Sequence, residues 1–157
     1  HFNGVGVVVS RLFNIIKPNR AYFGEKDFQQ LAIIKSLVKQ KSCGIEIVPC
    51  KIVRESDGLA MSSRNTRLTE NNRENASNIF RLLKFARAEV LKCKDLSEIQ
   101  KKLITELNSI PEYKIEYVIF AQENTLEPVD KTPNQAFRCF IAVYAGKIRL
   151  IDNQPMY

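Results

Sequence analysis

Histidine and tryptophan are the scarcest residue types in this sequence, whose 157 residues contain one histidine, His1, and no tryptophan. Because chain ends are commonly mobile, we expect His1 to be a poor general base. The sequence therefore disfavours catalysis by a cysteine–histidine pair.

Cysteine is also infrequent, and no two cysteines stand in a Cys-x-x-Cys pair. The four cysteines are Cys43, Cys50, Cys93 and Cys139, and only His1 could join them as a nitrogen ligand. We expect buried or half-buried free thiols rather than a zinc site, and we identify no metal-ligating set.

Long apolar runs are missing as well. The longest runs, such as 7–9 and 140–145, are far too short to span a bilayer, and the start shows no signal-peptide pattern. A hydrophobic content of 45% is nevertheless enough for a real core. We expect a globular cytoplasmic protein with no membrane partner.

Acidic residues are too few to balance the basic ones, so the formal net charge is +7 and the pI is about 9.3. The basic residues are spread over Lys35, Lys39, Lys41, Arg81, Lys84, Arg87, Lys92, Lys101 and Lys102. Because acidic residues are interleaved among them, this pattern favours solvated helix faces over a nucleic-acid surface. Part of the charge can serve an anionic substrate such as ATP or a carboxylate.

Helical and strand patterns alternate in the first part of the chain. Apolar spacing predicts a helix over 5–16, a strand over 21–23, a helix that opens at Asp27 and ends at Cys43-Gly44, and a strand over 45–48. This order is typical of a doubly wound α/β fold. We expect its second half, a partial Rossmann-like domain over 1–66.

The pattern changes after Asn65. One helix is predicted from Thr69 to Leu91 and another over 96–107, followed by strands over 113–121, 138–144 and 147–151, with a turn at Ala145-Gly146. We expect a small α+β domain over 67–157, with a mostly antiparallel sheet, that acts as a lid.

Two polar loops are candidate ligand sites. The first, Phe23 to Gln30, joins a strand to a helix through Gly24, Glu25, Lys26 and Asp27, which suits a phosphate group. In the second, the turn Asp57-Gly58 precedes Met61, Ser62, Ser63 and Arg64, whose hydroxyls and guanidinium suit a polyphosphate. An ordinary strand-to-helix turn and a polar surface loop remain the alternatives.

These motifs closely resemble those of the pantothenate synthetase family, also called pantoate beta-alanine ligases. The resemblance runs almost from end to end and includes His1–Val5, Phe23–Leu31, Asp57–Asn65 and Arg149–Asn153. It implies that ATP adenylates pantoate with loss of pyrophosphate, and that beta-alanine then displaces AMP to give pantothenate, on the route to coenzyme A.

The resemblance also implies site residues. ATP would be bound by Gly24, Glu25, Lys26, Asp27, Val53, Met61, Ser62, Ser63 and Arg64. Within this set, Gly24 and Asp27 would meet the ribose, Val53 and Met61 the adenine, and Lys26, Ser62, Ser63 and Arg64 the phosphates as the catalytic group. Pantoate would be held by Gln30 and packed by Val8, Val9 and Phe23.

Elementary chemistry agrees with part of this assignment. Charge that develops at the α-phosphorus needs cations already in place, so Lys26 and Arg64 are natural stabilisers, and magnesium is expected with the nucleotide. A carboxylate is already nucleophilic, so the first step requires no side-chain base.

One departure from the family concerns its His-x-Gly-His signature, which a chain with a single histidine cannot contain. We therefore expect the C-terminal portion of such an enzyme, inactive alone, and leave a homodimer open. Two alternative functions remain: another nucleotidyltransferase of the same superfamily, and a basic binding module without catalysis.

Overall fold

The structure, a computed structural model, describes residues 2–42 and 44–157, so the interpretations made for His1 and Cys43 lie outside the described residues. The chain divides into two compact units, His1–Ile52 and Val53–Tyr157. The change of pattern in the sequence instead predicts a boundary between residues 66 and 67. The division falls earlier because the segment 53–66 bonds and packs with later parts of the chain, for example through Leu59 in the C-terminal core.

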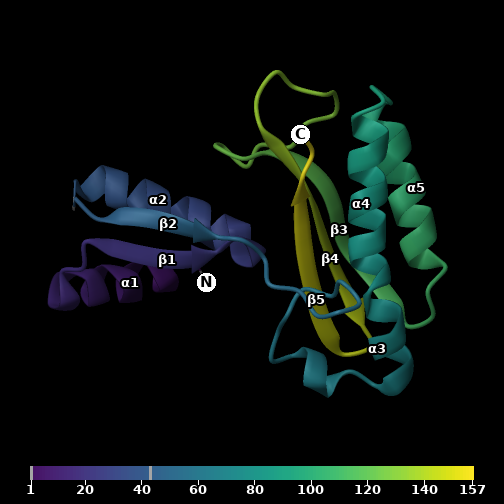
Figure 1. Cartoon of the computed structure of the whole chain (residues 1–157), viewed down its shortest axis with the longest axis horizontal. Helices are drawn as coiled ribbons and strands as arrows, with labels where there is room; N and C mark the ends of the chain where they lie inside the picture. Colours follow the sequence, from purple (N-terminus) through teal and green to yellow (C-terminus); the bar gives the residue numbers. More distant parts are fainter. Residues whose placement is uncertain (1, 43) are drawn as a thin grey trace. The chain divides into compact units, whose positions relative to one another are not determined.

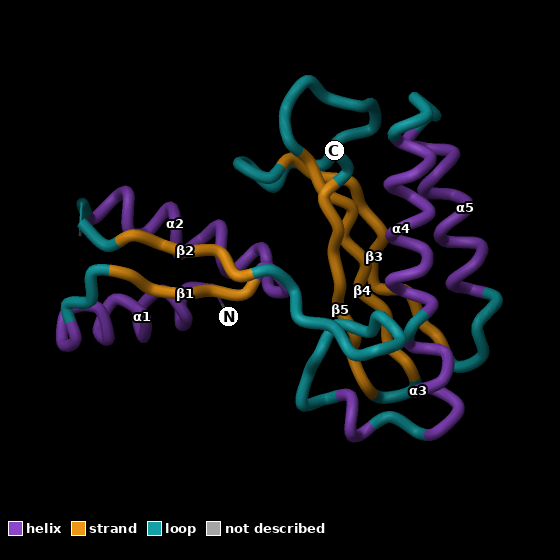
Figure 2. The backbone as a smooth tube through the Cα atoms, in the orientation of Figure 1, coloured by secondary structure: helices purple, strands orange, loops and turns teal. Residues whose placement is uncertain are grey.

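The N-terminal unit is a helix followed by a strand–helix–strand motif (Figure 1). Its elements are α1 (Phe2–Ile16), β1 (Arg20–Gly24), the 3-10 turn η1 (Glu25–Asp27), α2 (Phe28–Lys41) and β2 (Glu46–Cys50). β1 and β2 run parallel, with Tyr22 opposite Val48. Figure 2 shows the two strands side by side along the helices, and this parallel pair confirms the α/β pattern predicted for this part.

Helix α2 holds this unit together by packing against α1, β1 and β2. Its inward side chains include Leu31 and Ile34, whose exposed fractions are 1% and 0%. The helix ends through Ser42, which takes the left-handed conformation with φ 47° and donates its backbone N–H to Lys39 and Val38.

The C-terminal unit packs helices on one face of an antiparallel sheet (Figure 1). Its elements are η2 (Asn65–Arg67), α3 (Glu70–Ala76), α4 (Asn78–Val90), α5 (Leu96–Asn108), β3 (Tyr113–Gln122), β4 (Phe137–Ala145) and β5 (Ile148–Pro155), with the strand order β3-β4-β5. One continuous apolar cluster joins α4, α5 and the sheet through side chains such as Leu83, Leu103 and Ile141. The antiparallel sheet confirms the predicted α+β part.

The predicted helix from Thr69 to Leu91 is wrong in one respect, because it is broken at Ser77 into α3 and α4. The side chains of Asn75 and Asn78 donate to the backbone carbonyls of Asn71 and Asn75. Such local bonds compete with the helix and explain why the periodic apolar pattern did not keep one helix intact.

Strand β3 contains a second irregularity, a register shift between Ile115 and Tyr117. Ile115 packs against the core before the shift, whereas Val118 and Phe120 are buried in it after the shift. The extra residue of the bulge therefore keeps apolar side chains on the helix-covered face along the whole strand.

The cysteines only partly match the expectation of buried thiols. Cys139 is buried, but Cys50 and Cys93 are exposed, because Cys50 is the last residue of β2 and Cys93 lies in the turn after α4 with φ 57°. Burial raises the pKa of the Cys139 thiol, and the charge of Asp152 raises it further. None of the helices within residues 2–42 and 44–157 combines the length and the hydropathy that a membrane span requires.

Candidate active site

The first candidate loop lies wholly in the N-terminal unit. Gly24 ends β1, and Glu25, Lys26 and Asp27 form the single turn η1 directly before α2. Asp27 occupies the N-cap position of α2 without a side-chain cap hydrogen bond, so its carboxylate does not perform the capping role expected of a helix-opening Asp.

Gly24 has an ordinary extended conformation, with φ −69° and ψ 134°. A Cβ at this position would meet nothing within 4 Å. The fold of this loop therefore does not require glycine, and the space beside Gly24 is open to a ligand.

The residues expected to hold pantoate come from three elements of the same unit. Val8 and Val9 lie on α1, Phe23 lies on β1, and Gln30 lies in the first turn of α2. Val8 is 58% exposed, whereas the other three side chains are half-buried.

The second candidate loop belongs to the C-terminal unit and forms a small hairpin over 53–61. Arg54 and Ala60 form an isolated antiparallel bridge, and the Met61 N–H donates to the Val53 carbonyl at 2.9 Å. At the tip, Asp57 accepts from the Leu59 N–H at 3.0 Å, which confirms the predicted Asp57-Gly58 turn.

Gly58 is required at this tip for two reasons. Its φ is +95°, a conformation that side-chain-bearing residues rarely adopt. In addition, a Cβ would lie 2.5 Å from Cδ1 of Phe80, on α4. The hairpin therefore packs directly on α4.

Three of the polar residues expected at the phosphates, Ser62, Ser63 and Arg64, follow the hairpin. Ser62 is half-buried, whereas Ser63 and Arg64 are exposed. The Ser62 hydroxyl accepts from the Arg64 N–H at 3.2 Å, and η2 begins at the next residue. Val53 and Met61 are exposed apolar side chains, at 66% and 53%, and such a pair suits the flat apolar face of a base.

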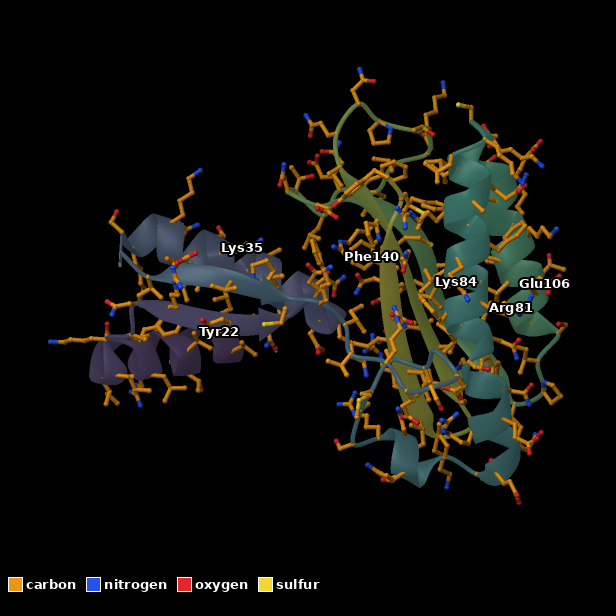
Figure 3. The ribbon with its side chains drawn as sticks, viewed as in Figure 1. Tyr22, Lys35, Arg81, Lys84, Glu106 and Phe140 are labelled. Carbon is orange, nitrogen blue, oxygen red and sulfur yellow. The ribbon has the colours of Figure 1, made fainter. Side chains whose placement is uncertain are left out.

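One anchor of this loop is Arg54. Its Nη1 and Nη2 donate to the two carboxylate oxygens of Asp152, on β5, at 2.6 and 3.0 Å. Nη1 also donates to the Gly58 carbonyl at 3.0 Å. The guanidinium carbon of Arg54 lies 3.7 Å from the centre of the Phe80 ring. The Nζ of Lys84, which is labelled on α4 in Figure 3, lies 4.9 Å from the centre of the same ring.

A second anchor joins the loop to α3. Arg73 bonds to Glu55 at 2.6 Å and also to Asp57, and the Asn65 amide donates to Glu55 at 2.7 Å. The hydrogen bond from Asn65, followed by that from Arg73, lowers the pKa of Glu55. Arg73 likewise lowers the pKa of Asp57, so both carboxylates stay charged at neutral pH.

Sequence reasoning missed these anchors. Asp152 lies within the family motif Arg149–Asn153 but has no predicted role, and the sequence predicts no contacts for Arg54 or Arg73. A half-buried arginine among acidic residues could have been suspected from the run Arg54-Glu55-Ser56-Asp57, but its partner is 98 positions away. No local pattern indicates such a pairing.

The two candidate loops therefore belong to different units. Gly24 to Asp27 are in the N-terminal unit, and Val53 to Arg64 are in the C-terminal unit, whereas the sequence predicts both loops within one domain over 1–66. That the loops face one ligand stays a prediction.

These features define an α/β protein in which polar loops follow its parallel strands. The family model described as pantoate-beta-alanine ligase matches residues 1–155, and the chain belongs to this family. The match thus confirms the family that the sequence motifs predict.

Curated relatives and solved structures carry the same family name. The pantothenate synthetase of Azobacteroides pseudotrichonymphae is 48% identical over 155 residues, which cover 98% of this chain and 55% of the relative. The crystal structure of pantothenate synthetase from Thermus thermophilus matches with a TM-score of 0.92 at 36% identity, and covers 98% of this chain and 55% of that one.

A third similar protein was solved with ligands. It is the pantoate-beta-alanine ligase of Francisella tularensis, complexed with beta-gamma ATP and beta-alanine, with a TM-score of 0.67 and 36% identity. The match covers 98% of this chain and 50% of that one. This chain thus spans about half the length of the relatives it matches.

Proposed function

We propose that this chain forms part of an ATP-dependent ligase that joins pantoate to beta-alanine. The observation that carries the proposal is the family match over residues 1–155. The ATP and beta-alanine in the Francisella structure support the same substrates. The product would be pantothenate, which leads on to coenzyme A.

In the first step, a carboxylate oxygen of pantoate attacks the α-phosphorus of ATP, and the bond from that phosphorus to pyrophosphate breaks. In the second step, the amine of beta-alanine attacks the acyl carbon of the pantoyl-adenylate. AMP leaves with the bonding electron pair, and the amine gives up its proton. The first step needs orientation and charge stabilisation rather than a side-chain base.

Two cationic side chains are proposed to stabilise the charge at the phosphates. Lys26 follows β1 in the turn before a helix, and Arg64 is exposed beside the Ser62 and Ser63 hydroxyls. Magnesium would arrive on the triphosphate, since it prefers phosphate oxygens and water to an all-protein cage. When bound, it would neutralise charge on the phosphates.

The other residues of the nucleotide site are proposed from the resemblance to the family's motifs, and the conformation of the loops supports them. Gly24, with open space where a Cβ would stand, and Asp27 are proposed at the ribose. Glu25 belongs to the same turn. The exposed side chains of Val53 and Met61 are proposed to enclose the adenine.

Pantoate is proposed to lie on the N-terminal unit. Gln30 would hold its polar groups, and Val8, Val9 and Phe23 would pack its methyl groups. A small branched hydroxy acid requires both a polar contact and an apolar wall.

The arrangement of the whole protein is a further part of the proposal. We infer a Rossmann-like nucleotide-binding part, a C-terminal unit that closes as a lid, a cytoplasmic location and a homodimer. The division between Ile52 and Val53 supports the lid, because each candidate loop lies within a different unit. Light scattering would test the dimer.

The function can be tested by a chimera in which this chain replaces the matching part of the Azobacteroides enzyme. Pantoate-dependent pyrophosphate release is expected from the chimera, and not from the 157-residue chain alone. Lys26→Ala in the chimera should lower this rate by on the order of 10² or more. Lys35→Ala, which removes an exposed lysine of α2 (Figure 3), is the matched control. A folded but inactive chimera, or full activity with Lys26→Ala, would refute the proposal.

A further inference from the structure

We propose that Arg54 is a positioning residue, which fixes the nucleotide-facing segment 61–64 to the C-terminal unit through Asp152 and Phe80. The consequence for ATP rests on the proposed function. The anchoring itself rests on contacts within the C-terminal unit alone.

The place of Arg54 in the chain gives it this role. It lies two positions after Ile52, where the first unit ends, and it opens the hairpin that leads to Met61. The segment 61–64 is therefore connected through the hairpin to the N-terminal unit, and through η2 and α3 to the C-terminal unit. Side-chain contacts decide which unit it follows.

Arg54 makes these contacts to three different parts of the unit. It bonds to Asp152 on β5, to the Gly58 carbonyl at the hairpin tip, and it lies over the Phe80 ring on α4. A planar guanidinium can satisfy all three at once, whereas an ammonium cannot bond to two carboxylate oxygens and stack in the same geometry. The hairpin is thereby fixed at its base and at its tip.

The carboxylate that receives Arg54 is itself held in place. The side chain of Asp152 is 3% exposed, and its Oδ1 also accepts from the Asn153 N–H at 2.8 Å. The Asn153 side chain accepts from Arg138 at 2.7 Å, and Arg138 donates to Glu123 at 2.7 Å. Arg54 thus connects the hairpin to a buried polar network that crosses the sheet.

The anchor through Arg73 is weaker by comparison. The side chains of Arg73, Glu55 and Asp57 are 34%, 30% and 34% exposed, whereas those of Arg54 and Asp152 are 17% and 3% exposed. Water and salt screen an exposed pair, but removing one partner of a buried pair leaves a charge without compensation. Loss of Arg54 should therefore loosen the hairpin, even with Arg73 and the buried side chain of Leu59 still in place.

The test is hydrogen exchange on the full 157-residue chain, read at single amides with and without magnesium ATP. In Arg54→Lys, the Met61 amide, which is bonded to Val53, should exchange about tenfold faster or more than in the wild type. Amides within β4 should keep their rates. ATP should slow exchange over 61–64 in the wild type, and less in Arg54→Lys.

Two further variants keep the outcome decisive. Asp152→Asn removes the carboxylate with little change in shape and should reproduce the faster exchange of the hairpin. Arg149→Lys makes the same replacement at the arginine that bonds to Glu116 on β3 at 3.2 Å, and should leave the hairpin unchanged. Unaltered exchange at Met61 in Arg54→Lys and Asp152→Asn, or equal acceleration throughout β4, would overturn the proposal. A wild type that ignores ATP would count against the nucleotide site, while the ligand-free rates still decide the role of Arg54.

Discussion

The two units differ in how completely each buries its own apolar side chains. In the N-terminal unit, Ile15, Ile16 and Tyr22 are 78%, 64% and 65% exposed, and the sheet formed by its described residues consists of β1 and β2. In the C-terminal unit, one apolar cluster connects the sheet with α4 and α5. A two-stranded parallel sheet with one open face has little apolar burial to stabilise it. The comparison indicates that the C-terminal unit supports itself, and that the N-terminal unit depends on further contacts.

Helix ends show the same difference. Thr69 caps α3 by accepting from the Asn72 N–H at 3.3 Å, and Asp95 caps α5 by accepting from the Ser97 N–H at 2.8 Å. At α2, the Asp27 side chain makes no cap hydrogen bond. Ser77, at the start of α4, likewise makes no side-chain cap hydrogen bond. Each side-chain cap contributes about 1 kcal/mol, so α3 and α5 have a local signal that α2 and α4 lack. Arg81 on α4 and Glu106 on α5, labelled in Figure 3, add an ion pair at 3.6 Å between these helices.

The largest expected effect comes from separating the units. Residues 53–157 expressed alone should fold cooperatively, and residues 1–52 alone should not, because the first piece has a closed core of its own. Circular dichroism during urea unfolding would measure this difference. A cooperative transition in 1–52, or none in 53–157, would reverse the comparison.

Core truncation should have the next largest effect. Leu103→Ala removes a side chain that is fully buried in the C-terminal cluster and should cost about 2–5 kcal/mol of the free energy of unfolding. Ile34→Ala, at an equally buried position of α2, should leave the main transition of the C-terminal unit unchanged. Urea titration of the full chain, followed in both units by hydrogen exchange, would distinguish the two variants. Equal loss of C-terminal stability in both would show that the units unfold as one.

Substitution of the glycine in the second loop, Gly58, should have a smaller effect on stability, and Gly24 in the first loop provides the control. Gly58→Ala should destabilise the C-terminal unit by about 1–3 kcal/mol, because of its positive φ and the contact with Phe80. Gly24→Ala should not reduce stability, since that position has an extended backbone and open space. Thermal unfolding would measure both, and a stability loss of similar size in Gly24→Ala would contradict this reading of the first loop.

The smallest effect is a pH dependence confined to the C-terminal unit. Glu89 accepts hydrogen bonds from the side chains of Lys94 and Lys92, and these bonds lower its pKa from 4.5 to about 2. Because the pKa of Glu89 is lower in the folded state than in the unfolded state, Glu89 contributes to the free energy of unfolding above pH 4.5. This contribution is lost as the pH falls towards 2. Glu89→Gln should flatten the pH dependence of the urea midpoint in this window. Glu46→Gln, which removes the exposed ion pair with Arg20, is the control and should leave the C-terminal midpoint unaffected.

How much of this could be predicted from the sequence depends on how local each signal is. The order of helices and strands, the Asp57-Gly58 turn and the turn at Gly146 follow from periodicity and turn residues, which act over a few positions. The break at Ser77 and the bulge after Ile115 depend on local hydrogen bonds and strand pairing that an apolar pattern does not encode. The resemblance to known motifs identified the family and the candidate residues. It did not indicate that the two loops belong to different units, because that depends on long-range contacts of the segment 53–66, among them those of Leu59 and Arg54.

The different exposure of Cys50, Cys93 and Cys139 allows thiol labelling to report unfolding of the C-terminal sheet. Cys50, at the end of β2, and Cys93, after α4, are open to solvent, whereas the Cys139 thiol is enclosed within the sheet and its pKa is raised by burial. A thiol-reactive dye should therefore label Cys50 and Cys93 from the folded state, because only a thiolate in contact with solvent reacts readily. Labelling of Cys139 has to wait until β4 separates from its neighbours. The delay between labelling of Cys50 and Cys93 and labelling of Cys139 measures the unfolding rate of the C-terminal sheet. Mass spectrometry of the labelled peptides would follow each of these cysteines in the unsubstituted protein.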